Sequence, residues 1–184
     1  MEKVELASKT FIIRKLEDSD LERALEFADY LNELVDDPEA LILQKSKKTS
    51  DEEREWLLGR LPEAKSAKSV MLVVECDSSI IGLAGAHLRP ERADHVAEVG
   101  VSILKGYRGI GLGSVLFEKI IESAKELNPR PAMLRLSAFG INKRAISTYE
   151  KHGFKEVARI PDQFQLGDQL VDEVVMVISL YPTS

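Results

Sequence analysis

The chain has 184 residues, of which 44 % are hydrophobic and 30 % charged, a balance typical of a folded globular protein rather than a disordered one. It carries 25 basic and 31 acidic residues, a formal net charge of −6. This excludes the broad basic face that nucleic acids and anionic membranes require. The single cysteine, Cys76, excludes an intrachain disulfide and favours a reducing compartment.

The length predicts one domain over residues 1–184, because domains average about 150 residues. The first six residues have no apolar core of signal-peptide length, and no apolar run approaches the roughly 18 residues of a membrane span. We therefore expect a cytoplasmic protein that does not enter a membrane.

The first half of the chain predicts one strand and two helices. A short apolar strand covers residues 10–14, and the acidic residues 17–20 then start a helix whose leucines and alanines keep helical spacing to position 34. Residues 36–38, Asp-Asp-Pro, interrupt that helix. A second helix begins at position 49 or 50, since both positions have a glutamate three residues on, as a capping box requires.

The second half predicts more strands. Apolar strands over 70–76 and 80–87 flank a turn and predict a hairpin. The remaining expected elements are a strand over 96–103, a helix over 112–127, a strand over 133–138, a short helix over 142–151 closed by Gly153, and strands over 154–160 and 170–180. The order β-α-α-β-β-β-α-β-α-β-β predicts a mixed α/β (α+β) fold.

The segment over 99–114 is the strongest functional signal, because a glycine-rich loop there joins a strand to a helix. Gly109, Gly111 and Gly113 allow a tight turn and a close approach to a ligand. The free N–H groups and dipole at the helix start then favour an anion such as phosphate, with Arg108 as an added charge.

Two nucleotide-binding interpretations fit this loop poorly. A Walker loop needs a lysine after its second glycine, but Leu112 follows Gly111. A Rossmann fingerprint should open the chain's first strand–helix unit and have an acidic residue about 20 positions on, and the strand over 133–138 has none. A glycine-rich turn without a ligand is the remaining alternative.

A third interpretation comes from a family resemblance. Arg108-x-x-Gly111-x-Gly113 resembles the pyrophosphate motif Arg/Gln-x-x-Gly-x-Gly/Ala of the GNAT superfamily of N-acetyltransferases. The later string of Asn142, Tyr149 and Gly153-Phe154 also resembles the family, as does the order of elements over nearly the whole chain.

The resemblance implies a GNAT-like fold, with a mixed, mostly antiparallel sheet splayed between the fourth and fifth expected strands and flanked by about four helices. Acetyl-CoA would lie in the gap between the strands over 96–103 and 133–138, and no metal is expected. The backbone of Val101, Ser102 and Ile103 would pair with the pantetheine arm. Backbone N–H groups would hold the pyrophosphate; these belong to Arg108, Gly109, Ile110, Gly111, Leu112, Gly113 and Ser114.

By the same resemblance Asn142 contacts the pantetheine arm, and Tyr149 is the general acid for the departing thiolate. Each has a structural alternative. Asn142 also fits a helix N-cap, and Tyr149 shares helical spacing with apolar residues and fits core packing. Gly153 is expected to cap the helix, and Phe154 to lie in the core.

The general base is the least defined part of the predicted site. Some relatives have a glutamate at the position of Ser137, so Glu98 is the best remaining carboxylate, with a solvent-facing strand residue as its alternative. His95 is a second candidate. We expect His87, His152 and Cys76 to be structural.

The reaction implied is direct transfer of acetyl to a primary amine, which is a small amine, a polyamine, an amino acid, or a protein lysine or N-terminus. Two loops would shape the acceptor pocket. One carries Glu33, Asp36, Asp37 and Glu39, and the other runs over residues 161–168. Their acids would favour a cationic acceptor, and a solvated acidic surface is the alternative. A noncatalytic acyl-CoA-binding module is the alternative function. Family members often dimerise, so the resemblance also allows a homodimer.

Overall fold

Residues 1–181 are described in the computed structural model, and their strands form one sheet in the order β1-β2-β3-β4-β5-β6-β8-β7. The strands are β1 Glu2–Leu6, β2 Lys9–Lys15, β3 Ser69–Cys76, β4 Ser79–Leu88, β5 Val96–Ile103, β6 Met133–Phe139, β7 Lys155–Leu166 and β8 Gln169–Ser179. The helices are α1 Ala24–Asp36, α2 Ser50–Lys65, α3 Leu112–Ala124 and α4 Lys143–Lys151, with short 3-10 turns at Asp18–Arg23, Glu91–Ala93 and Lys105–Tyr107.

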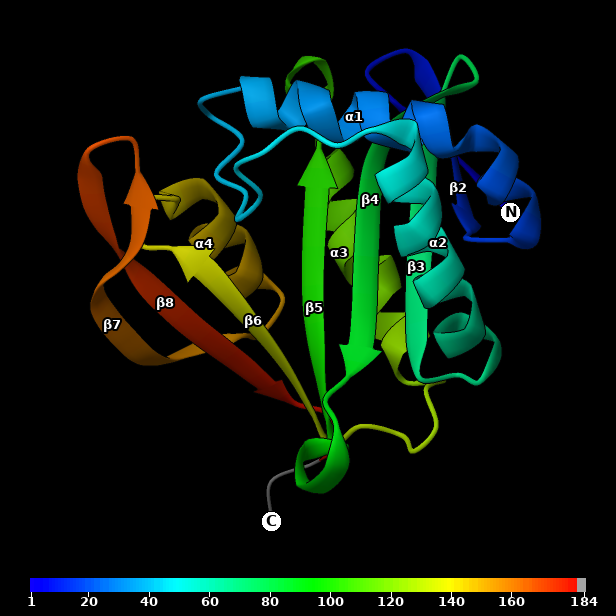
Figure 1. The fold of residues 1–184 in the computed structure, drawn as a ribbon. Helices are drawn as coiled ribbons and strands as arrows, with labels where there is room; N and C mark the ends of the chain where they lie inside the picture. Colours follow the sequence, from blue (N-terminus) through cyan, green and yellow to red (C-terminus); the bar gives the residue numbers. More distant parts are fainter. Residues whose placement is uncertain (182–184) are drawn as a thin grey trace.

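The helices cover the sheet in two layers. Helices α1 and α2 lie on one face, and α3 and α4 lie on the other (Figure 1). We call these the front face and the back face. Helix α3 packs against β3, β4 and β5, because its apolar side chains fall on one side; the buried ones are Leu112, Leu116, Phe117, Ile120 and Ala124. No helix among the described residues has the length and apolarity to cross a bilayer.

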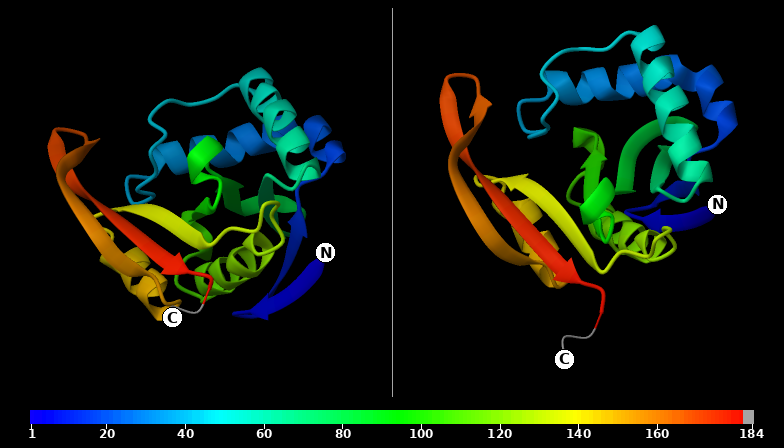
Figure 2. Two further views of the ribbon diagram at one scale, coloured as in Figure 1. Left: turned by 90° about the horizontal axis from the view of Figure 1, so that it is seen from below. Right: turned by 60° about the horizontal axis from the view of Figure 1, so that its bottom comes forward.

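Strands β5 and β6 form the one parallel pair in this sheet, and they remain paired over a short distance. Their register joins Val96 to Met133, Ala97 to Leu134 and Glu98 to Arg135, and no pairing follows. Beyond these positions β6, β8 and β7 turn away from the rest of the sheet and leave a V-shaped gap (Figure 2). The predicted splay between these two strands is confirmed.

Several element boundaries differ from the prediction in the first half. Strand β1 was not predicted; it pairs antiparallel with β2 through a two-residue turn. Residues 18–23, expected to be α-helical, form a 3-10 turn before α1. Of the two starts considered for α2, the structure has Thr49 as the cap, with Glu52 completing the capping box.

Two boundaries differ in the second half. Helix α3 ends at Ala124 rather than at Leu127, although Leu127 is still buried in the core. The expected loop over 161–168 is wrong: β7 continues to Leu166, and a tight turn leads into β8. The pairing of β7 with β8 is irregular between Ile160 and Phe164, where Pro161 and Asp162 weaken the strand signal in the sequence.

Candidate active site

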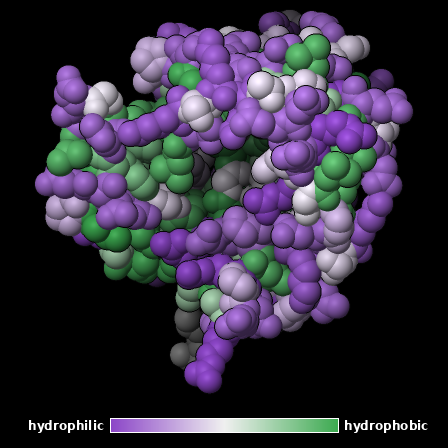
Figure 3. Space-filling view, in the orientation of Figure 1, coloured by the Kyte–Doolittle hydropathy of each residue, from purple (hydrophilic) through white to green (hydrophobic). Residues whose placement is uncertain are grey.

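A cavity of about 480 Å³ occupies the gap where β5 and β6 part. Its walls come from the unpaired ends of both strands, the glycine loop, α4, β7 and the segment between α1 and α2. On the front face the cavity opens as a hollow, with hydrophobic residues gathered on the wall nearest β7 and β8 (Figure 3). The cavity therefore reaches the glycine loop at one end and the front face of the sheet at the other.

The glycine loop forms the back part of the cavity. Gly109 and Gly111 have φ values of +87° and +91°, a left-handed conformation that disfavours any residue with a Cβ. Gly111 is the N-cap of α3, so the unpaired N–H groups of the first helical turn lie beside the cavity. Five residues of this loop line it: Arg108, Gly109, Gly111, Gly113 and Ser114.

Two other loop residues predicted to bind cofactor do not line the cavity. Leu112 is fully buried, and Ile110 packs against the hydrophobic core. Only their backbone groups remain for ligand binding. Of the strand residues, Val101, Ser102 and Ile103 all line the cavity, as predicted for the pantetheine channel.

Arg108 has partners within the protein. Its Nε donates to the carbonyl of Ile103 at 2.7 Å, and its NH1 contacts Asp37 at 2.6 Å. Burial would raise the pKa of Asp37, but the N–H of Glu39 and the Arg108 guanidinium outweigh it, so this pKa lies below its usual range. Arg108 thus ties the end of α1 to the end of β5, although it was predicted as a phosphate contact.

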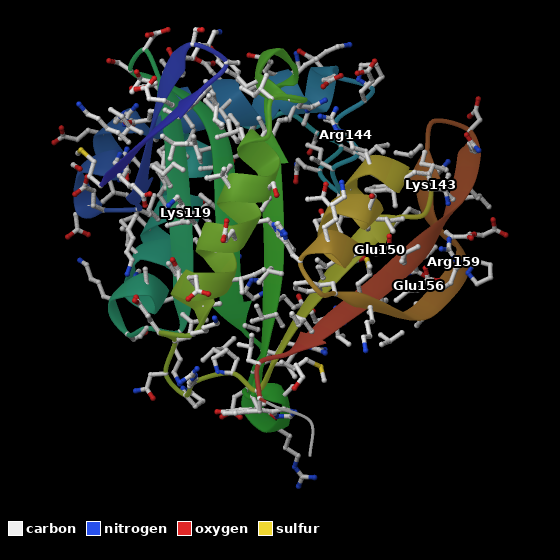
Figure 4. The ribbon with its side chains drawn as sticks, turned by 180° about the vertical axis from the view of Figure 1, so that it is seen from behind. Lys119, Lys143, Arg144, Glu150, Glu156 and Arg159 are labelled. Carbon is white, nitrogen blue, oxygen red and sulfur yellow. The ribbon has the colours of Figure 1, made fainter. Side chains whose placement is uncertain are left out.

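Arg144 is a cation that the sequence reasoning missed. It lies in the first turn of α4 and lines the cavity, and its guanidinium nitrogen is 3.2 Å from where a Cβ on Gly109 would stand. Figure 4 shows Arg144 with Lys143 at one end of α4 and Glu150 further along. No ion pair involves Arg144 among residues 1–181. A cation in the first turn opposes the helix dipole, and that was the available signal for a ligand.

Tyr149 enters the cavity from α4. Its ring packs on Phe117 of α3 with centroids 4.8 Å apart. Burial raises the pKa of its hydroxyl above the ordinary value of 10. No protein hydrogen bond engages this hydroxyl in the described part of the chain. The core-packing alternative for Tyr149 therefore holds, while its hydroxyl is left free to face the cavity.

Asn142 and Ser102 both line the cavity, but both side chains are engaged. The Oδ1 of Asn142 accepts from the N–H of Ala145 at 3.1 Å, so the N-cap alternative is confirmed. The buried Tyr30 of α1 donates to the Ser102 carbonyl at 3.0 Å, and the two hydroxyls lie 2.7 Å apart. These contacts fix the backbone on both sides of the gap.

Glu98 lies apart from the other residues predicted for the active site. It is the last residue of β5 that pairs with β6, and it lies outside the cavity lining. Its carboxylate contacts Arg135 at 2.5 Å, His87 at 3.5 Å and Arg89 at 3.8 Å. These contacts hold the Glu98 carboxylate at the paired end of β5, away from the cavity. The geometry does not support Glu98 as the base.

His95, the second candidate base, and two residues expected to be structural, Cys76 and His152, lie outside the cavity lining. His95 precedes β5 at the surface, and Cys76 is buried at the end of β3. His152 follows α4, where its Nε2 is 3.2 Å from the Ser114 hydroxyl and its ring stacks near Phe117.

The front part of the cavity is apolar rather than acidic. The segment between α1 and α2 contributes Ala40, Leu41, Ile42 and Leu43 and the single carboxylate Glu39. Phe139 and Phe164 stack with centroids 4.5 Å apart and complete the wall.

The acids of this segment are paired instead. Asp36 contacts Lys47 at 2.7 Å and Glu39 contacts Lys105 at 3.2 Å, while Asp37 contacts Arg108. Of the four acids predicted to recruit a cationic acceptor on this loop, Glu33 alone takes part in no ion pair among residues 1–181, and it is exposed.

Comparison with known proteins gives one family. Residues 27–154 match the acetyltransferase (GNAT) family. A solved acetyltransferase of the GNAT family from Streptococcus pneumoniae superposes with a TM-score of 0.80 at 25 % identity, covering 93 % of this chain and 99 % of that one. YncA from Salmonella typhimurium, a candidate acetyltransferase solved with its cofactor acetyl-CoA, superposes with a TM-score of 0.78 at 19 % identity, covering 95 % and 96 %.

A curated relative matches over a shorter stretch. YwnH from Bacillus subtilis, named as a candidate phosphinothricin acetyltransferase, is 38 % identical over 65 residues. That stretch is 35 % of this chain and 39 % of the relative.

Proposed function

The chain belongs to the acetyltransferase (GNAT) family, and we propose that it transfers the acetyl group of acetyl-CoA to a primary amine that has an apolar body. The single observation that carries the acceptor class is the aliphatic and aromatic lining of the front half of the cavity, where Asp36 and Glu39 beside the segment between α1 and α2 are already paired.

The back half of the cavity has the groups that acetyl-CoA needs. The turn at Gly109 and Gly111 leaves N–H groups at the start of α3 for a pyrophosphate. Arg144 adds a positive charge beside the same loop. The unpaired edge of β5 offers backbone groups to the pantetheine amides, and when bound, acetyl-CoA supplies the activated acetyl thioester.

We assign the acid role to Tyr149. Its hydroxyl has no competing hydrogen-bond partner among residues 1–181, and its raised pKa keeps it protonated at neutral pH. A phenol with a raised pKa is a weak full donor to a thiolate, so hydrogen bonding to the departing sulfur is the larger part of its contribution. The ring contact with Phe117 fixes its direction.

The acceptor class follows from the match between the apolar wall of the front opening and an acceptor with an apolar body. Leu41, Ile42 and Leu43 face Phe139 and Phe164 across the front opening, and burying an apolar group there is favourable by roughly 25 cal/mol per Å². A polyamine would bring several charges to a wall that has one carboxylate, Glu39, and that carboxylate is paired with Lys105. An aromatic or aliphatic primary amine fits better.

The test is an acceptor comparison that follows release of the CoA thiol. 2-Phenylethylamine, spermidine, a lysine-containing peptide and phosphinothricin are each supplied with acetyl-CoA. We expect the highest kcat/KM for 2-phenylethylamine. A higher value for spermidine or phosphinothricin would contradict the proposed acceptor class. Calorimetric titration with acetyl-CoA, ATP and NAD in parallel checks the glycine loop separately.

A further inference from the structure

Ser137 lines the cavity, and its hydroxyl has a defined partner. It donates a 2.5 Å hydrogen bond to Oε1 of Glu173 on β8, across the β6–β8 pairing. Glu173 takes part in no ion pair among residues 1–181. The cavity therefore has a hydroxyl on its wall with an anionic carboxylate behind it.

The side chain of Ser137 points to the front face. Ser102 meets Tyr30 of α1, which marks the front side of β5. Glu98 is four residues from Ser102 and shares that side, and it binds Arg135 of β6. Ser137 is two residues beyond Arg135 on the same strand, so it also faces the front, where the acceptor enters.

Tyr149 lies on the opposite side of the same gap. Its ring packs on Phe117 of α3, which covers the back face. The hydroxyls of Ser137 and Tyr149 therefore approach the gap from its two faces. A group between them has a proton acceptor on the front and a proton donor at the back.

We propose that Ser137 and Glu173 form the route by which the acceptor amine loses its proton, an inference that rests on the proposed acetyl transfer. Because the Ser137 hydroxyl donates to Glu173, its oxygen lone pairs are free to accept an N–H from the amine. Glu173 acts through Ser137 and does not itself reach the cavity.

The protons balance as follows. An alkylammonium acceptor loses two protons overall. One passes to the Ser137 oxygen as the serine proton moves to Glu173, which releases it to solvent. The amine nitrogen bonds to the thioester carbonyl carbon, and the bond between that carbon and sulfur breaks. Tyr149 stabilises the departing sulfur by a hydrogen bond, and the second proton of the nitrogen reaches the sulfur by way of solvent.

The charged neighbours of Glu173 have other partners. On β6, Arg135 is bound by Glu98, and on β7, Arg159 is bound by two other carboxylates. Asp162 lies in the irregular stretch of β7. The hydrogen bond from Ser137 is thus the contact through which Glu173 influences the site.

The experiment measures kcat/KM from about pH 6 to pH 10 for two amines of nearly equal shape. These are 2-phenylethylamine and 2,2-difluoro-2-phenylethylamine, whose fluorines make its ammonium group more acidic. The proteins are the wild type, Ser137→Ala, Glu173→Gln and the matched control Asp172→Asn, which changes the adjacent carboxylate on the other side of β8.

We expect Glu173→Gln and Ser137→Ala each to lower kcat/KM for 2-phenylethylamine about 100-fold near neutral pH, because each variant breaks the same proton route. Both losses should shrink at high pH and for the fluorinated amine, because less deprotonation is then required. The Kd of acetyl-CoA should not change, and Asp172→Asn should stay within about two-fold of the wild type.

An equal loss for both amines at every pH would overturn the proposal, because it would indicate a structural role. The same pattern in Glu98→Gln but not in Glu173→Gln would also overturn it. If Glu173→Gln folds poorly, Ser137→Ala and Glu173→Asp decide the question. Spermidine is run in parallel: a wild-type preference for it would contradict the acceptor class, while the ratios of variant to wild type would still test the proton route.

Discussion

The two ends of the β5–β6 pair differ in the contacts that their backbone and side-chain groups make. At the paired end, three residues of each strand are in register and Glu98 binds Arg135 across it. At the parted end, Val99–Ile103 and Ser137–Phe139 have no strand partner on that side and line a cavity.

The difference shows how one pair of strands can stabilise the sheet at one end and form a binding site at the other. Backbone groups must find hydrogen bonds, so strands that part need a substitute partner, and a ligand with amides is a suitable one. Three features hold the parted end open: the Tyr30–Ser102 contact, the Arg108–Asp37 ion pair and the capped start of α4. The predictions below test the division between the two ends.

The largest expected effect is at the parted end. Tyr149→Phe should lower kcat about 100-fold, because the departing sulfur loses its hydrogen-bond donor. The Kd of acetyl-CoA, measured by calorimetry, should not change, since the ring and its packing on Phe117 remain. Unchanged turnover would remove Tyr149 from the mechanism.

The pH dependence of the wild type tests the same hydroxyl. An acid must be protonated to act, and burial raises the pKa of Tyr149 above 10, so its active form persists to higher pH than for an ordinary tyrosine. We expect no fall in kcat between about pH 7 and pH 10. A fall in this range that Tyr149→Phe abolishes would contradict the raised pKa.

A smaller effect is expected at the glycine loop. Arg144→Ala should weaken acetyl-CoA binding about 10-fold, because one charge-assisted contact to phosphate is lost. Lys143→Ala is the matched control, since Lys143 is the preceding residue of α4 and does not line the cavity. Equal losses in both variants would indicate a general charge effect instead of a specific contact.

The ion pair at the top of the gap should have a still smaller effect. Asp37→Asn frees the segment between α1 and α2 from Arg108, and we expect the KM of the acceptor to rise about five-fold, equivalent to roughly 1 kcal/mol. Asp36→Asn breaks the exposed pair with Lys47 and should change KM little. Steady-state kinetics at saturating acetyl-CoA measures both.

The smallest effect is expected at the paired end. Arg135→Met removes the ion pair with Glu98 and should reduce the free energy of unfolding by about 0.5 kcal/mol, since both side chains are partly exposed. Denaturant unfolding measures this change. A loss of kcat/KM larger than about two-fold would show that the paired end also acts in the reaction.

The sequence by itself was sufficient for the features that depend on short spacings. The glycine loop, the amphipathic face of α3, the Asn142 cap and the Gly153 turn follow from local backbone rules, and the structure has all of them. The splay between the strands over 96–103 and 133–138 was implied by the family resemblance, and the register confirms it.

The contacts between residues far apart in the chain were decided by the tertiary structure. Arg108 meets Asp37 across 71 positions, and Ser137 meets Glu173 across 36, and no local pattern encodes either contact. Glu98 was the best carboxylate by position along its strand, but the β5–β6 register placed Arg135 beside it. The physical reason is that strand register and helix packing choose which side chains face one another, whereas local spacing chooses only the side of the element on which each lies.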